Sequence, residues 1–173
     1  MKNLMKQQSG FSLIELMVVV GIISLLAMVA VPKFSQFQNR AKQTEATSNL
    51  AGIYTAETAF ASQWNSYYQA LDIIGFSPNG KVRYNCGWTA GNGNVPAAAG
   101  WTSSTKSAFS ELPGISLQSD VQTAGLQAIP STTAATATSF VASCIADFNT
   151  AGTNKDTWTI DNTNTVSQTS NGI

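Results

Sequence analysis

The sequence predicts an α+β fold, in which one long kinked N-terminal helix packs on a small antiparallel β-sheet head. An almost uncharged apolar run comes first, and a helical pattern of apolar residues follows it without a turn signal. Turns rich in Gly, Asn and Pro then separate short segments in which apolar and polar residues alternate, as is typical of strands. One helix followed by three or four such strands is an α+β arrangement.

The apolar run extends from Phe11 to Val31 and carries a single charge, Glu15. A helix of this length is about 30 Å long, which matches the hydrocarbon core of a bilayer. A secretory signal also has a basic start, but its apolar part is shorter and ends in a small-residue cleavage site, which two alanines near the end imitate only weakly. We therefore expect residues 11–31 to span a membrane after a basic leader, residues 1–10.

Glu15 is costly in such a span, because an acid at the centre of a membrane helix costs roughly 2.5 to 3.5 kcal/mol on insertion scales. In one interpretation the carboxylate snorkels to the membrane interface, since it lies only four residues into the span. In the other, a cation neutralises it inside a bundle of packed spans. A buried ion pair of that kind fixes register more than it adds stability.

The segment GFSLIELMVVVGIISLLAMVAVPKF resembles the N-terminus of type IV pilins and their relatives, the pseudopilins. The resemblance implies that an inner-membrane peptidase cuts between Gly10 and Phe11 and then methylates the new amino terminus of Phe11. It makes Glu15 the near-invariant acid of the family, with the freed Phe11 amine of a neighbouring subunit as its partner. It is specific over about residues 6–65 and weaker at IIGFSPNGKVRYNCG and DTWTIDN.

The helical pattern continues beyond the span in four apolar residues at helical spacing, Leu50, Ile53, Phe60 and Trp64. This stripe, with Glu57 beside it, predicts one continuous helix from about Phe11 to Trp64, after which Asn65 ends the helical pattern. Residues 32–65 are the head-packing half. Pro32 removes a backbone hydrogen bond, so we expect a kink there. Phe34 and Phe37 follow the kink and are expected to find partner helices in a filament.

The head comprises residues 66–173. Alternating patterns predict strands at Lys81–Gly87, Phe140–Phe148, Thr157–Asp161 and near Val166. We expect a helical turn at residues 70–74, a loop over residues 88–101 and an exposed Ser/Thr/Ala tract over residues 130–139.

Cys86 and Cys144 are the only cysteines, and both lie in predicted strands of the head. The predicted topology places the head outside the cytoplasm, where oxidation is allowed. A disulfide closing this loop is worth about 4 kcal/mol from chain entropy, and the alternative is two buried free thiols. In most pilins the pair brackets a loop near the C-terminus, so the adhesive role of that loop is not carried over.

Composition excludes several function classes. Charged residues make up 10% of the chain, their signs balance, and there is no His. No basic patch supports direct nucleic-acid binding. No GxSxG motif or acid pair at helical spacing supports catalysis, so we expect no enzymatic activity and no cofactor.

Asp147, Asn149 and Asp156 are weak calcium candidates. The segment from Asp147 echoes the start of an EF-hand loop, but Trp158 stands where the loop needs its acid, so an EF-hand is rejected. Major pseudopilins hold calcium near their C-terminus, whereas a solvated turn is the favoured interpretation here.

The resemblance implies the structural subunit of a type IV pilus, a retractable surface filament for adhesion and surface motility. Its partners are other copies of itself, the prepilin peptidase and methyltransferase, the inner-membrane assembly machinery and, before assembly, the membrane. We expect a single-pass precursor in the inner membrane and then a pilus at the cell surface. The alternative is a major pseudopilin of a type II secretion system, and a membrane-anchored enzyme comes third.

Overall fold

The computed structural model describes residues 10–78, 80–89, 108, 116–117, 133–148 and 155–172. It contains two compact units, Met1–Arg40 and Ala41–Ile173. The elements in order are α1 (Leu13–Trp64), β1 (Lys81–Val82), β2 (Asn85–Gly87), β3 (Ser116–Leu117), β4 (Ala134–Ala135), β5 (Phe140–Asp147), β6 (Lys155–Asp161) and β7 (Val166–Ser170). The predicted α+β class, one long apolar helix and an antiparallel sheet, is confirmed.

Helix α1 is 52 residues long and continues through Pro32. Its end at Trp64 is marked by Asn65, which adopts a left-handed backbone with φ of 54°. The amide of Asn65 donates to the carbonyl of Ala61 at 2.8 Å, which closes the last turn. Asn tolerates this backbone better than most residues and is a common helix terminator. The predicted boundary at the Trp64–Asn65 step is therefore correct, while the kink at Pro32 stays a prediction.

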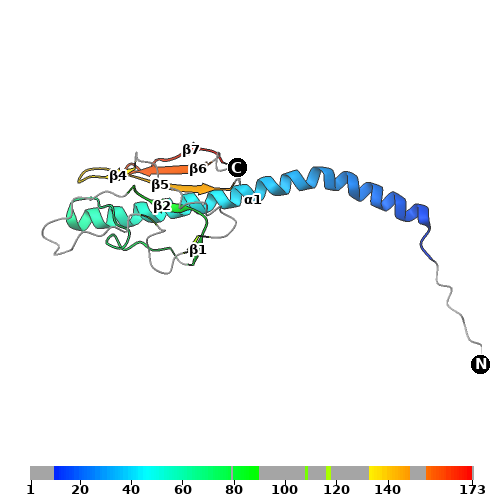
Figure 1. Cartoon of the computed structure of the whole chain (residues 1–173), viewed down its shortest axis with the longest axis horizontal. Coiled ribbons are helices and arrows are strands. Elements are labelled where there is room, and N and C mark those ends of the chain that lie inside the picture. Colours follow the sequence, from blue (N-terminus) through cyan, green and yellow to red (C-terminus); the bar gives the residue numbers. More distant parts are fainter. Residues whose placement is uncertain are drawn as a thin grey trace, which may run out of the picture. The chain divides into compact units, whose positions relative to one another are not determined.

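The main sheet has five strands. Its path is β2-β5-β6-β7, with β4 also pairing β5, and all of these pairs are antiparallel. Figure 1 shows β5, β6 and β7 running alongside the C-terminal half of α1. A second sheet, the parallel pair β1-β3, was not expected from the sequence.

The core of the head forms where α1 meets the central strands. Leu50 and Ile53 are fully buried and Phe60 is nearly so, which confirms the predicted stripe on the helix. Alanines on both partners, Ala46 of α1 and Ala142 of β5, are also fully buried. Small side chains let the helix and the strand approach closely, and each fully buried large apolar side chain contributes about 1.5 to 3 kcal/mol.

The prediction of one strand over residues 81–87 is wrong. Strand β1 ends at Val82 and β2 begins at Asn85. Between them, the backbone amide of Arg83 donates to Glu45 Oε1 of the helix at 2.6 Å instead of to a neighbouring strand. A carboxylate 38 residues away therefore interrupts a pattern that is locally strand-like.

The prediction that residues 130–139 are exposed is wrong in part. Residues 136–139 are exposed, but Thr133 and Ala135 are buried. The amide of Thr89 donates to Thr133 Oγ1 at 3.0 Å, and Ala135 lies opposite Phe140 in the β4-β5 pair. Strand pairing therefore draws part of this tract into the core. Residues 130–132 and most of the predicted loop at 88–101 lie outside the described residues.

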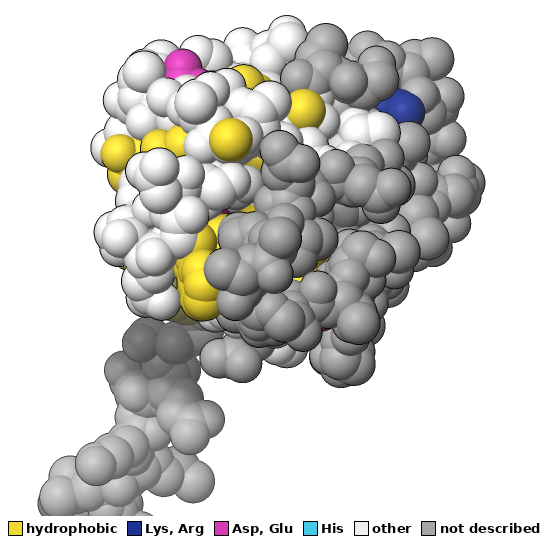
Figure 2. Space-filling view, turned by 90° about the vertical axis from the view of Figure 1, so that its left-hand side faces the viewer, with side chains coloured by type: hydrophobic (Ala, Val, Ile, Leu, Met, Phe, Trp, Pro, Cys, Tyr) yellow, Lys and Arg dark blue, Asp and Glu magenta, His cyan; other side chains and the backbone are white. Residues whose placement is uncertain are grey.

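The described surface of the head is weakly charged. On the face in Figure 2, hydrophobic side chains lie among polar ones and coloured charged side chains are sparse. Several acids are buried instead, since Glu57, Asp147 and Asp156 are all at most 1% exposed. The described part of the head therefore has few charges at its surface.

Candidate functional site

The first half of α1 presents an unusually apolar surface. Its large apolar side chains up to Val31 are all at least 44% exposed, and Phe11, just before the helix, is 79% exposed. Among the described residues, α1 is the one helix long and apolar enough to cross a membrane, and none of its most apolar stretch is buried in the structure. An apolar surface of this extent needs a cover of lipid or of other apolar helices.

The start of α1 places Glu15 at a helix-capping position that the sequence analysis missed. The helix begins at Leu13, and the amide of Leu16 donates to the carbonyl of Ser12 at 3.2 Å. Ser12 thus takes the N-cap position and Glu15 the third helical position, which is the spacing of a capping box. An acid in the first turn also interacts favourably with the helix dipole. The Ser-x-x-Glu pattern was the signal that could have revealed this.

Gly10 and Phe11 lie beside this cap and are exposed. A methyl group added at Gly10 would meet no atom within 4 Å, so packing inside the described chain does not require glycine there. If glycine is required at this position, the requirement would therefore come from another protein that binds this segment. Cleavage after Gly10 and methylation of Phe11 stay predictions.

The predicted disulfide between Cys86 and Cys144 is present. The two residues lie directly opposite each other in the β2-β5 pair, and both are fully buried. The sulfur of Cys144 lies 3.7 Å from the carbonyl oxygen of Ala46, so the bond packs against α1. It fixes the edge strand β2 to the centre of the sheet beneath the helix.

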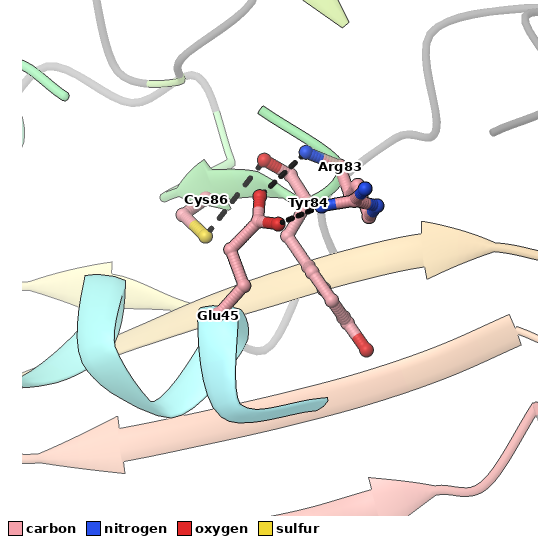
Figure 3. A network of polar contacts seen from close by, with 4 residues as sticks. All are labelled: Glu45, Arg83, Tyr84 and Cys86. Carbon is pink, nitrogen blue, oxygen red and sulfur yellow. Dashed lines mark hydrogen bonds and ion pairs between the residues drawn. The ribbon is translucent and has the colours of Figure 1, made fainter. Parts of the chain in front are cut away.

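Glu45 and Arg83 form a second link between α1 and the sheet region (Figure 3). Glu45 accepts the backbone amide of Arg83 through Oε1 and the Arg83 guanidinium through Oε2, the latter at 3.0 Å. Both side chains remain partly exposed, so the ion pair itself adds at most about 1 kcal/mol. Its main effect is to hold the segment between β1 and β2 on the helix.

Asp156 of β6 is fully buried and accepts hydrogen bonds from four side chains. Trp158 Nε1 and Gln168 Nε2 donate at 3.0 and 2.8 Å, Gln43 Nε2 of α1 donates at 3.5 Å, and Tyr84 donates its hydroxyl proton. Burial, followed by the hydrogen bond and charge of Asp156, raises the pKa of Tyr84 above its usual range. The carboxylate therefore joins α1, β6, β7 and the residue before β2.

These bonds bear on the calcium candidates. The oxygens of Asp156 are already engaged by protein donors, and Asp147 is 1% exposed. Asn149 lies outside the described residues. Among the residues that the structure describes, no three His, Cys, Asp or Glu side chains gather into a metal-binding group. The four donors to Asp156 suit a structural carboxylate. The favoured interpretation of a solvated turn is wrong for Asp147 and Asp156, because both are buried, and the three residues stay untested as calcium candidates.

Glu57 lies within the apolar stripe rather than beside it. The residue is fully buried, and its Oε2 accepts the backbone amide of Tyr68 at 3.2 Å. Its other oxygen has no hydrogen-bond partner among the described residues. Burial raises the pKa of Glu57 to about 8, although the Tyr68 bond acts in the opposite direction. The carboxyl is therefore mostly protonated at neutral pH.

Comparison with protein families places a known motif on this helix. A family model described as "Prokaryotic N-terminal methylation motif" matches residues 5–31. The match covers the Gly10–Phe11 step, Glu15 and the apolar surface described above. It agrees with the resemblance noted from the sequence.

Three relatives extend the comparison. The chain is 46% identical over 91 residues to the "Type IV major pilin protein PilA" of Myxococcus xanthus, covering 53% of this chain and 38% of that protein. It is 34% identical over 110 residues to the "Type IV major fimbrial protein FimA" of Dichelobacter nodosus, covering 62% and 57%. It is 36% identical over 78 residues to the "Type II secretion system core protein G" of Pseudomonas aeruginosa, covering 43% and 55%.

The matched segments thus span 38% to 57% of the length of these relatives. The relatives compared include major pilins and fimbrial proteins as well as one secretion protein. The methylation motif, these relatives and the long helix on an antiparallel sheet together support a type IV pilin, and they support it better than a type II secretion pseudopilin.

Proposed function

We propose that this chain is the structural subunit of a type IV pilus and polymerises through the first half of α1. The observation that carries the proposal is the exposed apolar surface of residues 11–31, with its single acid in the first helical turn. Lipid covers such a surface in a membrane-held precursor, and copies of the same helix cover it in a fibre. When a subunit leaves the membrane and joins the fibre, the same apolar surface passes from contact with lipid to contact with neighbouring subunits.

Processing comes first in this proposal. A prepilin peptidase and methyltransferase removes residues 1–10, cutting between Gly10 and Phe11, and methylates the new amino terminus of Phe11. The methylation motif over residues 5–31 supports this step, as does the exposure of Gly10 and Phe11.

Glu15 then sets the register of the fibre. The freed amine of Phe11 on one subunit neutralises Glu15 on a neighbour once both lie in the apolar interior of the filament. Removing one partner of a buried pair typically costs about 3 to 5 kcal/mol, because a charge is left uncompensated. One acid and one amine per subunit therefore favour one axial stagger over all others.

The location of the chain follows from these steps. The precursor is a single-pass protein of the inner membrane, and the inner-membrane assembly machinery adds it to a filament at the cell surface. Retraction, adhesion and surface motility are proposed because the relatives are major pilins and fimbrial proteins. A polymer of this kind acts through its mechanical continuity, so the proposal assigns the chain no catalysis of its own.

A second candidate is the major pseudopilin of a type II secretion system. The 36% identity to a secretion core protein favours it specifically. Such a subunit shares the processed helix but builds a short periplasmic fibre. The two candidates differ in where the polymer is found.

The test is an intact-mass measurement on filaments sheared from the cell surface. We expect the mature chain to begin at a methylated Phe11 and to contain one disulfide. Gly10→Leu should leave a full-length, membrane-held precursor, because the bulky side chain occupies the cut site.

Gly21→Leu is the matched control, since a side chain at Gly21 also meets open space, and it should be processed normally. A mature chain that starts at Met1, or beyond Ala30, would contradict the proposal. Surface filaments without this chain, combined with a block in protein secretion, would favour the pseudopilin instead.

A further inference from the structure

In the segment of α1 that follows the apolar half, all charged residues have the same sign. Between Glu15 and Glu45 the charged residues are all basic, namely Lys33, Arg40 and Lys42. The ammonium group of Lys42 lies 4.9 Å from the centre of the Phe148 ring, so Lys42 is engaged within the head. Lys33 and Arg40 are exposed on the helix before the head, and Arg40 also has an interaction within the chain.

These two basic residues share a helix face with exposed aromatic side chains. Lys33, Phe37 and Arg40 are spaced by four and three residues, which places them along one stripe. Phe34 lies three residues before Phe37 on the same side, and the two rings are 64% and 65% exposed. The segment 33–40 thus combines positive charge with exposed aromatic surface.

The depth of this segment follows from the geometry of the helix. With a rise of about 1.5 Å per residue, Lys33 lies about 3 Å and Phe37 about 9 Å beyond Val31. A bilayer has about 5 to 8 Å of headgroup layer on each side of its core. Lys33 therefore lies within the headgroup layer when residues 11–31 fill the core, and Phe37 lies just outside it. Arg40, about 13 Å beyond Val31, lies about 5 to 8 Å outside that layer, which is within the Debye length of about 8 Å at physiological salt, so the charge of the membrane surface is still felt there.

We propose that the stripe Lys33–Phe37–Arg40, with Phe34, binds anionic phospholipid headgroups and so sets the depth of the membrane-held subunit. The inference rests on the proposed function, because it requires that residues 11–31 cross a membrane. Lysine and arginine at the interface pair with lipid phosphates, and aromatic rings anchor at the same level. The ligand is a lipid of net negative charge, such as phosphatidylglycerol, on the side of the membrane where the head lies.

Charge complementarity favours lipid over a second copy of this chain. The described part of the head contains six carboxylates: Glu45, Glu57, Asp72, Asp147, Asp156 and Asp161. Three are buried and Glu45 pairs with Arg83, which leaves Asp72 and Asp161 as the acidic side chains at the described surface of the head. Asp72 also has an interaction within the chain. The described head therefore offers this stripe two separate surface carboxylates, whereas an anionic leaflet offers a dense array of negative charge.

The orientation of the chain adds a second argument. Membrane proteins usually keep Lys and Arg on the cytoplasmic side of a span. In the proposed topology Lys33 and Arg40 lie on the opposite side, within ten residues of the end of the span. Basic residues at this position oppose the usual preference for Lys and Arg on the cytoplasmic side. Binding of anionic lipid would explain why they are there.

The test reconstitutes the full chain into nanodiscs that contain equal amounts of phosphatidylglycerol and phosphatidylcholine. Native mass spectrometry then measures the ratio of the two lipids that remain bound to the chain. We expect phosphatidylglycerol to be enriched on the wild type. Lys33→Gln should lower the enrichment about fivefold, the change expected for one interfacial basic residue, and Lys33→Arg should retain it.

Lys81→Gln is the matched control, because Lys81 is also an exposed lysine but lies on β1 in the head. It should leave the lipid ratio unchanged. The inference is overturned if the wild type shows no preference, or if Lys81→Gln lowers it as much as Lys33→Gln. It is also overturned if Lys33→Gln reduces cross-linking between copies in detergent while the lipid ratio stays the same. Failure of the chain to enter the nanodiscs would instead contradict the proposed function.

Discussion

At the scale of single residues, Glu57 links the stability of the head to pH. It is fully buried in the helix stripe with one hydrogen bond, and its pKa is raised to about 8. The unfolded chain exposes the same carboxyl, whose pKa there is the ordinary 4.5 of a glutamate. Between these two values the unfolded state loses its proton while the folded state keeps it. The contribution of Glu57 to the stability of the head should therefore be greatest below pH 4.5 and fall as the pH rises from 4.5 to 8.

Glu57→Gln tests this dependence. Glutamine keeps an oxygen for the Tyr68 amide but does not titrate, so the variant should be more stable than the wild type at pH 7, by up to about 3 kcal/mol. The two proteins should converge as the pH falls below 4.5, where Glu57 is neutral in both states. Urea unfolding of the detergent-solubilised chain, followed by near-ultraviolet circular dichroism, measures both curves. Parallel curves across this pH range would show that burial of the acid does not couple folding to pH.

Single residues also show where sequence reasoning succeeds. Glu15 was identified because it is the single charge in an apolar run. The burial of Glu57 was not predicted, because a polar residue next to a stripe normally lies at its solvent edge. The bonds of Asp156 could not be predicted, since their donors come from four separate places along the chain.

At the scale of elements, the loop after α1 is held by an aromatic ring over a glycine. A methyl group added at Gly52 would approach the ring of Phe76, with its Cζ at 2.8 Å. Glycine in a helix interior costs about 1 kcal/mol relative to alanine. This cost is offset by the close approach of the Phe76 ring, which fixes the segment between α1 and β1 against the helix.

The effect of Gly52→Ala on the stability of the head should change sign when the Phe76 ring is removed. Gly52→Ala should destabilise the head by about 1 kcal/mol, because displacing the ring costs more than the gain in helix propensity. In the Phe76→Ala background the same substitution should stabilise it by about 0.5 to 1 kcal/mol. Thermal unfolding of the four proteins completes a double-mutant cycle. The same effect of Gly52→Ala in both backgrounds would rule out the ring as its cause.

Elements with strong local patterns were predicted well. The observed start of β5 and ends of α1 and β6 coincide with the predicted ones, because apolar periodicity and turn residues define them. The break between β1 and β2 was missed because Glu45, distant in the sequence, binds the intervening amide. The parallel pairing of β1 with β3 was missed because no local signal specifies a partner strand.

At the scale of the whole molecule, the two halves of α1 differ in what covers their apolar side chains. The second half of α1 is held to the sheet by the stripe, the disulfide, Glu45 and the Asp156 network. The first half has no apolar partner among the described residues, and all its large side chains are exposed. The fold therefore completes the head within one chain and leaves the first half of α1 to be covered by lipid or by other copies.

Glu15 is the residue on which the assembly account depends, and it has two separable roles. Its position in the first turn fits a capping box with Ser12, and its charge is proposed to pair with the Phe11 amine of a neighbour. Glutamine serves a capping box as well as glutamate does but carries no charge. Comparing Glu15→Gln with Glu15→Val therefore separates the cap from the ion pair.

The most direct measurement compares the yield of sheared surface filaments with the amount of processed subunit left in the membrane. Both Glu15→Val and Glu15→Gln should be inserted and cut after Gly10, because the cut site is unchanged. Both should nevertheless lose filaments or form very few, since the Phe11 amine of each incoming subunit lacks its partner at every step of the fibre. Normal filament yield from either variant would contradict the charge-register mechanism and leave Glu15 as a helix cap or an interfacial acid.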